Sequence, residues 1–412
     1  MTAASLAGAA WLRGGALARL LTALDRDGEE ARVVGGAVRN ALLGEPIGDV
    51  DLATTALPEE VVRRASAAGF KPVPTGIEHG TVTVVVEGKP FEVTTLRQDV
   101  ETDGRHAKVA FGRDWKADAE RRDFTMNALS AKADGTVFDY VGGRSDLEAR
   151  RVRFIGEARK RIAEDYLRIL RFFRFHAAYG HGLPDAEGLA ACIAARGGLD
   201  QLSRERVRME LMKLVVVPHA VSALAVMTEA GLLVPVLGGV PELASFANMT
   251  KLEHGLGLRN DPARRLAALG VRIAEDAERL WQRLRLSNVE HERLASMGEA
   301  WWQIKASSDK DARALLYRLA SERFADRVLI AWSRSRAGAE DAGWHDLATL
   351  PQRWTAPVFP LKAADFIKRG LPQGPALGAA LHAAEAAWIA ADFPGDARAI
   401  EAIAVTAVAS TR

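Results

Sequence analysis

The chain has 412 residues and a mass of 44.5 kDa, which corresponds to two to four domains at roughly 100–200 residues per domain. Hydrophobic residues make up 48% and charged residues 26%, a globular composition that excludes a largely disordered or fibrous protein. The 55 Lys and Arg against 53 Asp and Glu leave a net charge of +2, so overall charge by itself does not indicate a nucleic-acid partner.

The N-terminal segment 1–24 is apolar and rich in alanine, and its leucines predict an amphipathic first helix. No basic region precedes the apolar run, which argues against a signal peptide. The uncharged stretch 214–228 contains Pro218 and His219 and is shorter than the roughly 20 residues of a membrane-spanning helix. The single cysteine, Cys192, excludes intrachain disulfides and cysteine-based metal clusters. We therefore expect a cytoplasmic protein that does not associate with membranes.

Residues 31–140 alternate between short β-branched runs and helical segments. The runs 81–86 and 91–96 are separated by Glu-Gly-Lys-Pro, which predicts a hairpin. The span 97–116 shows little periodicity, and connections of that length are usually functional or disordered. Strands are predicted at 32–34, 50–52, 81–86, 91–96 and 136–140, and helices at 37–43, 58–68 and 119–130.

From residue 144 onward the sequence predicts helices joined by short loops. Together with the first part, this pattern predicts an α+β fold: an N-terminal head with a mixed sheet and helices, followed by an all-α C-terminal half. We expect the chain to divide into a head at 1–143, a helical neck at 144–215, a helical body at 216–355 and a helical tail at 356–412. Helices are predicted at 161–179, 203–216, 221–230, 262–284, 289–304, 310–320, 363–370 and 374–391.

A glycine pair, Gly35-Gly36, stands between the predicted strand 32–34 and the predicted helix 37–43 of the head. Two glycines let backbone N–H groups approach a phosphate, and the start of the helix adds the positive end of its dipole. Arg39 lies one turn into the helix and could pair with the same phosphates. An ordinary tight turn would show the same glycines, and no Walker lysine or Gly-x-Gly-x-x-Gly run is present.

Asp49-Val50-Asp51 follows ten residues after Arg39. On a strand the two aspartates share one face while Val50 points to the core. Neighbouring carboxylates repel each other unless a cation lies between them, and oxygen-only ligation suits Mg²⁺. A lone Asp-x-Asp is also typical of a solvated loop. Beside a phosphate-binding turn, however, the pair indicates a nucleotidyl-transfer site with Asp49 and Asp51 as metal ligands.

These motifs resemble those of the DNA polymerase β nucleotidyltransferase superfamily, and more closely those of the class II tRNA nucleotidyltransferases (CCA-adding enzymes) and bacterial poly(A) polymerases. The resemblance covers residues 31–215 in the family's order, with a weaker match near the C-terminus. Asn40 departs from the family, where aspartate is common. Further matching segments are 79–82, 91–97, 103–106, 121–128, 164–168, 203–206 and 210–213.

The resemblance implies a polymerase-β-like head and the template-independent addition of C and A to the 3′ end of tRNA. CTP and ATP would be the substrates, Mg²⁺ the cofactor and pyrophosphate the product. It further implies that the neck carries a nucleobase-selecting helix and that the body binds RNA. The alternatives are a poly(A) polymerase, or an enzyme that adds only A. A catalytically silent RNA-binding protein is disfavoured by the intact Arg39, Asp49 and Asp51. The oligomeric state stays open.

Several roles follow from this resemblance alone. Arg122 would contact the nucleotide, Asp123 would accept the ribose hydroxyl, and Asn127 would be a weaker contact. Glu92 would be a third carboxylate that helps to deprotonate the attacking hydroxyl; a surface glutamate in a hairpin is an equal alternative. The span 97–116 would be the flexible loop that moves between C and A addition.

Residues 144–174 carry ten basic and five acidic side chains, a local excess of positive charge. Arg168, Arg171 and Arg174 recur every three residues and predict a basic stripe that binds a triphosphate or an RNA end. Asp165 and Arg168, three apart on the predicted helix 161–179, would be surface neighbours. A carboxylate acceptor beside a guanidinium donor matches the Watson–Crick edges of cytosine and adenine but not those of uracil and guanine. A solvated basic face and a surface salt bridge are the alternatives.

Overall fold

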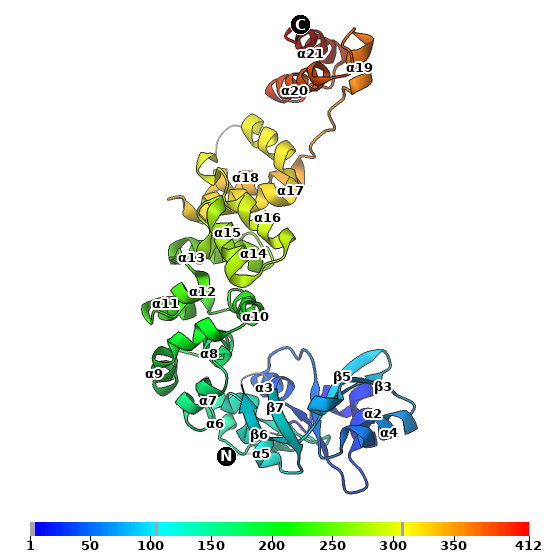
Figure 1. The fold of residues 1–412 in the computed structure, drawn as a ribbon, viewed down its shortest axis with the longest axis vertical. Helices are drawn as coiled ribbons and strands as arrows, with labels where there is room; N and C mark the ends of the chain where they lie inside the picture. Colours follow the sequence, from blue (N-terminus) through cyan, green and yellow to red (C-terminus); the bar gives the residue numbers. More distant parts are fainter. Residues whose placement is uncertain (1–4, 104–105, 306–308, 412) are drawn as a thin grey trace. The chain divides into compact units, whose positions relative to one another are not determined.

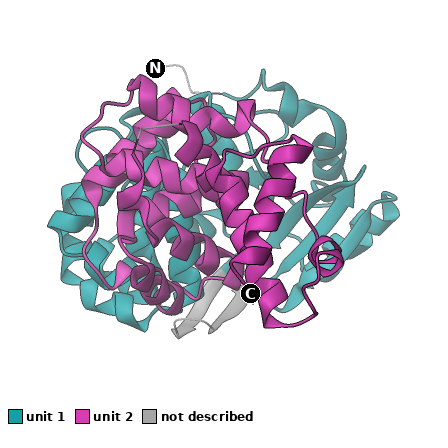
Figure 2. Ribbon diagram, turned by 90° about the horizontal axis from the view of Figure 1, so that it is seen from above, with its two compact units in different colours: residues 1–236 teal, residues 237–412 magenta. Residues whose placement is uncertain are grey.

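The computed structural model describes residues 5–103, 106–305 and 309–411, with the backbone alone at 98–103 and 106–110. The chain forms two compact units, Met1–Val236 and Leu237–Arg412, each described here by itself (Figure 2). Within the described residues, no helix is both long enough and apolar enough to cross a membrane.

The first unit is built on a mixed seven-stranded sheet in the order β3-β4-β5-β2-β1-β8-β9. The pair β2–β5 is parallel and the other pairs are antiparallel. The sheet is followed by helices, as Figure 1 shows, and this confirms the predicted α+β class. The strands are β1 (Ala31–Val34), β2 (Asp51–Thr54), β3 (Lys71–Gly76), β4 (Thr81–Val86), β5 (Lys89–Thr95), β8 (Ser130–Ala131) and β9 (Val137–Phe138).

Short helices accompany this sheet. Helix α2 buries Leu17, Leu20, Leu21 and Leu24, which confirms the amphipathic N-terminal segment. Helix α4 begins with Pro58, whose fixed φ suits the first helical turn. The helices are α1 (Ala10–Arg13), α2 (Gly15–Leu24), α3 (Gly36–Leu43), α4 (Pro58–Ala67) and α5 (Trp115–Glu120).

The predicted helix at 119–130 is wrong. Helix α5 ends at Glu120, a 3₁₀ turn covers Thr125–Asn127, and β8 follows. The reason is tertiary: Phe124 is extended and fully buried, and it packs against Phe154, with ring centroids 4.9 Å apart. An extended residue at this point stops the helix and turns Asp123 and Asn127 toward the interior.

The span 97–116 also differs from its prediction as an unstructured connection. It forms a hairpin of β6 (Arg97–Asp103) and β7 (His106–Phe111), and residues 104–105 lie outside the described part. In the described chain these strands pair with each other and not with the main sheet. A register shift between Asp99 and Glu101 interrupts their regular pairing.

Helices make up the rest of the first unit, and the predicted helix 161–179 divides in two. Helix α7 ends before Asp165, whose φ of −158° and ψ of 105° are extended, and α8 starts at Leu167. Tyr166 packs its ring so closely on Gly198 that a Cβ there would lie 2.0 Å from it. The helices are α6 (Gly143–Glu148), α7 (Ala158–Glu164), α8 (Leu167–Tyr179), α9 (Ala186–Ala194), α10 (Arg204–Leu214), α11 (Ala220–Glu229) and α12 (Leu233–Leu237).

Helices are the only regular elements among the described residues of the second unit. The predicted helix 262–284 breaks after Gly270, and the predicted helix 289–304 ends at Gly298. The two ends pack closely on each other, because a Cβ on Gly298 would lie 2.6 Å from the backbone of Ile273, just before α15. The helices are α13 (Leu243–Gly255), α14 (Pro262–Gly270), α15 (Ala274–Leu284), α16 (Asn288–Gly298), α17 (Asp309–Arg334), α18 (Ala342–Arg353), α19 (Ala363–Lys368), α20 (Pro375–Ala390) and α21 (Ala397–Ala409).

Candidate active site

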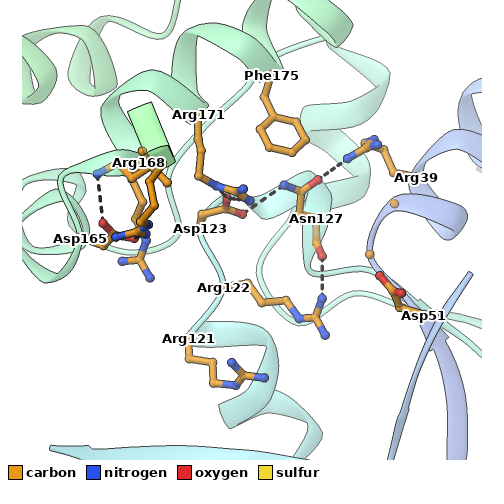
Figure 3. Close-up of a pocket in the computed structure, with 14 residues that line it drawn as sticks. Arg39, Asp51, Arg121, Arg122, Asp123, Asn127, Asp165, Arg168, Arg171 and Phe175 are labelled. Carbon is orange, nitrogen blue, oxygen red and sulfur yellow. Dashed lines mark hydrogen bonds and ion pairs between the residues drawn. The ribbon is translucent and has the colours of Figure 1, made fainter. Parts of the chain in front are cut away.

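A pocket of about 510 Å³ lies in the first unit, a volume typical of small-molecule sites. Asp51 lies on one side of the view in Figure 3, and Asp165 and Arg168 lie on the other. Of the predicted site residues, Asp49, Glu92 and Arg174 are not part of the lining. The lining consists of Gly35, Gly36, Arg39, Asp51, Arg121, Arg122, Asp123, Asn127, Asp165, Leu167, Arg168, Arg171, Phe175 and Arg206.

The glycine pair forms the turn between β1 and α3 at the edge of this pocket. Gly35 has a φ of +68°, which side chains other than glycine rarely adopt, and Gly36 is the first residue of α3. A Cβ on Gly35 would also lie 3.3 Å from Nη1 of Arg122. The turn therefore brings backbone and the start of a helix next to a cationic side chain, an arrangement suited to an anion.

Asp51 and Glu92 belong to neighbouring parallel strands. Leu52 is paired with Val93 in the register of β2 and β5, and both are fully buried. The preceding residues, Asp51 and Glu92, therefore fall side by side on the opposite face. Partial removal of water raises the pKa of Asp51, and the charges of Glu92 and Asp49 raise it further, against a lowering by Arg122.

Asp49 lies outside β2, which begins at Asp51. The expectation that both aspartates belong to one strand is therefore wrong. It is exposed in the preceding loop, near enough to contribute to the raised pKa of Asp51. No three acidic, histidine or cysteine side chains of the described residues lie close enough to enclose a metal ion by themselves. Crowded carboxylates at a phosphate-binding turn nevertheless fit a divalent cation that takes one or two protein ligands and completes its shell with phosphate and water.

Arg39 is buried, and its guanidinium is held by protein groups. Nη1 donates to Oδ1 of Asn127 at 2.5 Å, and Nη2 donates to the hydroxyl of Tyr179 at 2.7 Å. Nε and Nη2 both donate to Oδ1 of Asn40. The side-chain oxygen of asparagine thus accepts from Arg39 at the position where aspartate is common in the family. The guanidinium predicted to pair with phosphates is thus already fixed between α3, the 3₁₀ turn and α8.

Asp123 is buried at the centre of the pocket (Figure 3). Its Oδ2 accepts two hydrogen bonds from Arg171, at 2.8 and 2.6 Å, and its Oδ1 accepts from the backbone of Phe124 and from Nδ2 of Asn127. Burial alone would raise the pKa of Asp123. The charge of Arg171 and these hydrogen bonds outweigh that effect and hold the pKa below its ordinary value.

Arg122 and Arg121 lie at the end of α5, and both pair with the buried Asp118. Arg121 is held at 2.6 Å, whereas Arg122 reaches Asp118 at 3.2 Å and the carbonyl of Asn127 at 3.4 Å. The weaker contacts leave Arg122 better able to turn toward a ligand. Arg121 was missed by the sequence reading, although it is adjacent to Arg122 in the same motif.

Asp165 and Arg168 both line the pocket, but they are not neighbours on one helix as predicted. Asp165 lies in the break between α7 and α8, where its Oδ2 accepts from Arg206 of α10 at 2.5 Å. Arg168, in the first turn of α8, donates to Glu164 and to the carbonyl of Arg161 at 2.7 Å. Because of the break, the Asp165 carboxylate, an acceptor, reaches the pocket from the connection between the helices, and the Arg168 guanidinium, a donor, reaches it from α8.

The basic stripe on α8 is only partly directed at the pocket. Arg171 lines it and also pairs with Glu210, at 3.5 Å. Arg174 bonds to the same buried glutamate at 2.5 Å and lies outside the lining. Leu167, Phe175 and Arg206 complete the pocket and were missed by the sequence reading. Arg206 stands in the Ser-Arg-Glu-Arg segment, which was the one available signal for it.

Comparisons with known proteins match most of the chain. The family model "Poly A polymerase head domain" matches residues 31–153, and "Probable RNA and SrmB- binding site of polymerase A" matches 185–246. The mitochondrial CCA tRNA nucleotidyltransferase 1 of Mus musculus is 35% identical over 369 residues, which cover 88% of this chain and 83% of the relative. The CCA-adding enzyme of Geobacillus thermodenitrificans is 45% identical over 215 residues, 52% of each chain.

A solved structure shows the same fold. The CCA-adding enzyme of Bacillus stearothermophilus, in complex with CTP, superposes with a TM-score of 0.73 at 32% identity. The match covers 90% of this chain and 92% of the other.

Proposed function

The chain belongs to the family of class II CCA-adding enzymes, and we propose that it adds C and A to the 3′ end of tRNA, without a template, from CTP and ATP. The observation that supports this most directly is the single pocket that joins Gly35, Asp51 and Asp165. The relatives are named for CCA addition, which favours this activity over poly(A) synthesis or addition of A alone.

The layout of the pocket gives a nucleotide its direction. Phosphates fit at the turn of Gly35 and Gly36, where the first N–H groups of α3 have no partner within the helix. Arg122, loosely held and close to Asp51, offers a positive charge beside this turn, since its Nη1 would lie 3.3 Å from a Cβ on Gly35. The base then points to the other side, toward Asp165 and Arg168, as their positions in Figure 3 suggest.

The proposed reaction is an in-line displacement. The 3′ hydroxyl of the RNA attacks the α-phosphorus, a new phosphodiester bond forms, and pyrophosphate leaves. Glu92, beside Asp51 in the strand register, accepts the proton of the attacking hydroxyl. Asp49 and Asp51 would hold Mg²⁺, which when bound would neutralise the charge that develops on the phosphates. Asp123, held by Arg171 and Asn127, orients the ribose end of the nucleotide.

The activity is tested with a tRNA transcript that ends before CCA. The purified protein is given each labelled NTP singly and in pairs, and the 3′ ends of the products are sequenced. Addition of C, C and A followed by arrest is the expected result. A long ladder of A would show poly(A) synthesis, and A incorporation without any C would show an enzyme that adds A alone.

The hairpin β6–β7 is expected to serve the last addition. Among the described residues this hairpin pairs with no strand of the main sheet, and an isolated two-stranded hairpin is marginally stable and can shift as a unit. Shortening it between Asp99 and His106 is expected to impair addition of the terminal A while leaving C addition close to normal. Sequencing of the product ends should then show accumulation at CC. Equal loss of C and A addition, or no loss of either, would contradict this role.

A further inference from the structure

Helix α8 presents three side chains to the head along one face. Arg171, Phe175 and Tyr179 are spaced by four residues, so they lie above one another on the helix surface. Arg171 and Phe175 line the pocket. Tyr179 lies at the last residue of the helix, two turns away from Arg171, where it meets Arg39 of α3.

Hydrogen bonds connect the two ends of this face through the head. The hydroxyl of Tyr179 accepts from Arg39, which donates to Asn127. Asn127 donates to Oδ1 of Asp123 at 3.1 Å, and Arg171 donates to Oδ2 of the same carboxylate. The connection therefore begins and ends on α8 and passes through three residues of the head. Figure 3 shows its part from Arg39 to Arg171.

Phe175 lies near both Arg39 and Arg171, the two arginines of this hydrogen-bonded connection. Its buried ring centroid lies 5.3 Å from the guanidinium carbon of Arg39 and 5.3 Å from that of Arg171. The ring of Tyr179 stacks on it, with centroids 5.9 Å apart, and the Arg39 guanidinium also lies 3.9 Å from the Tyr179 ring centroid. Aromatic faces attract cations, so the Phe175 ring stabilises the guanidinium groups of Arg39 and Arg171, and the Tyr179 ring stabilises that of Arg39 as well.

We propose that Tyr179 is a positioning residue for nucleotide binding, which acts through Arg39 and Asn127 on Asp123. Arg39 is buried, and its bond to Tyr179 ties it to the neck as well as to the head. With that bond in place, Asn127 meets a fixed donor and keeps its amide directed at Asp123. The inference rests on the proposed function, since it assigns Tyr179 to the site where the nucleotide binds.

The test is Tyr179→Phe, which keeps the ring and removes only the hydroxyl. We expect kcat/KM for CTP and ATP to fall about tenfold, the loss typical of one hydrogen bond to a charged group. The fall should appear as a rise in KM with kcat nearly unchanged, because the change loosens a binding site before chemistry begins. A purely structural role would instead lower the melting temperature without this selective rise in KM.

A double-mutant cycle shows whether Tyr179 acts through Arg39. In an Arg39→Met background, Tyr179→Phe should have no further effect, because its partner is already gone. Arg39→Leu, which also removes the donor, serves the same purpose should the methionine variant not fold. Tyr317→Phe is the matched control: it also loses a hydrogen bond, to Glu385 in the second unit, and should leave KM for both nucleotides unchanged.

Three results would overturn the inference: wild-type kinetics for Tyr179→Phe, a loss that is additive with Arg39→Met, or an equal loss for Tyr317→Phe. Failure of the proposed function is recognised separately. In that case the wild-type protein itself would add neither C nor A to tRNA.

Discussion

Asp51→Asn is expected to lower the rate of nucleotide addition by about a thousandfold or more, the scale on which charge stabilisation acts in enzyme sites. Asp51 is the one acidic member of the β2–β5 pair that lines the pocket, and it lies beside Glu92 and opposite Arg122. Replacing the carboxylate by an amide keeps its shape and removes the charge that would hold Mg²⁺ near the triphosphate. Binding of tRNA should be almost unchanged, because the substitution leaves the basic side chains intact.

Single-turnover addition of labelled CTP at saturating Mg²⁺ measures this loss, and a gel-shift titration measures tRNA binding. Glu45→Gln is the matched control, since Glu45 is an exposed carboxylate in the loop between α3 and β2. It should retain the wild-type rate. Substantial Mg²⁺-dependent turnover by a folded Asp51→Asn protein would rule out Asp51 as a metal ligand.

Arg168→Ala and Asp165→Ala are expected to change which nucleotide is added. Cytosine and adenine each present an amino donor beside a ring-nitrogen acceptor, which complements a carboxylate beside a guanidinium. Uracil and guanine present a carbonyl beside an N–H, the reverse order, and each mismatched group in a buried site costs about 1–3 kcal/mol. Removal of either side chain therefore removes roughly a tenfold to hundredfold preference, or the ability to use CTP and ATP altogether.

The separate partners of Asp165 and Arg168 allow the two substitutions to be compared with each other. The carboxylate of Asp165 accepts from Arg206, and the guanidinium of Arg168 donates to Glu164, so the two charged groups are held by different partners. Each substitution should thus remove one half of the base contact and leave the other half in place. Ratios of initial rates for CTP, ATP, UTP and GTP measure the change, and Lys160→Ala on the exposed side of α7 is the control. Wild-type ratios in both variants would exclude selection by Asp165 and Arg168.

The sequence alone predicted that the head mixes strands and helices, that the remainder is helical, and most of the residues that line the pocket. These features depend on short-range properties: hydrophobic periodicity, glycines that tolerate a positive φ, and motifs whose residues lie within a few positions of one another. Gly35 and Asp51 were found in this way, whereas Arg122 and Asp123 were identified through the family resemblance. Asp165 was found from its spacing to Arg168 on a helix that the structure divides. All five line one pocket.

Tertiary structure decided how those residues work together. The helix that the sequence predicted at 161–179 breaks at Asp165 because Tyr166 packs against Gly198, more than thirty residues further along. Glu92 comes beside Asp51 only through the parallel register of β2 and β5. Arg39 meets Asn127 and Tyr179, which are 88 and 140 positions away. Such contacts depend on how separate elements pack, and local spacing carries no information about which distant side chain will fill the space opposite.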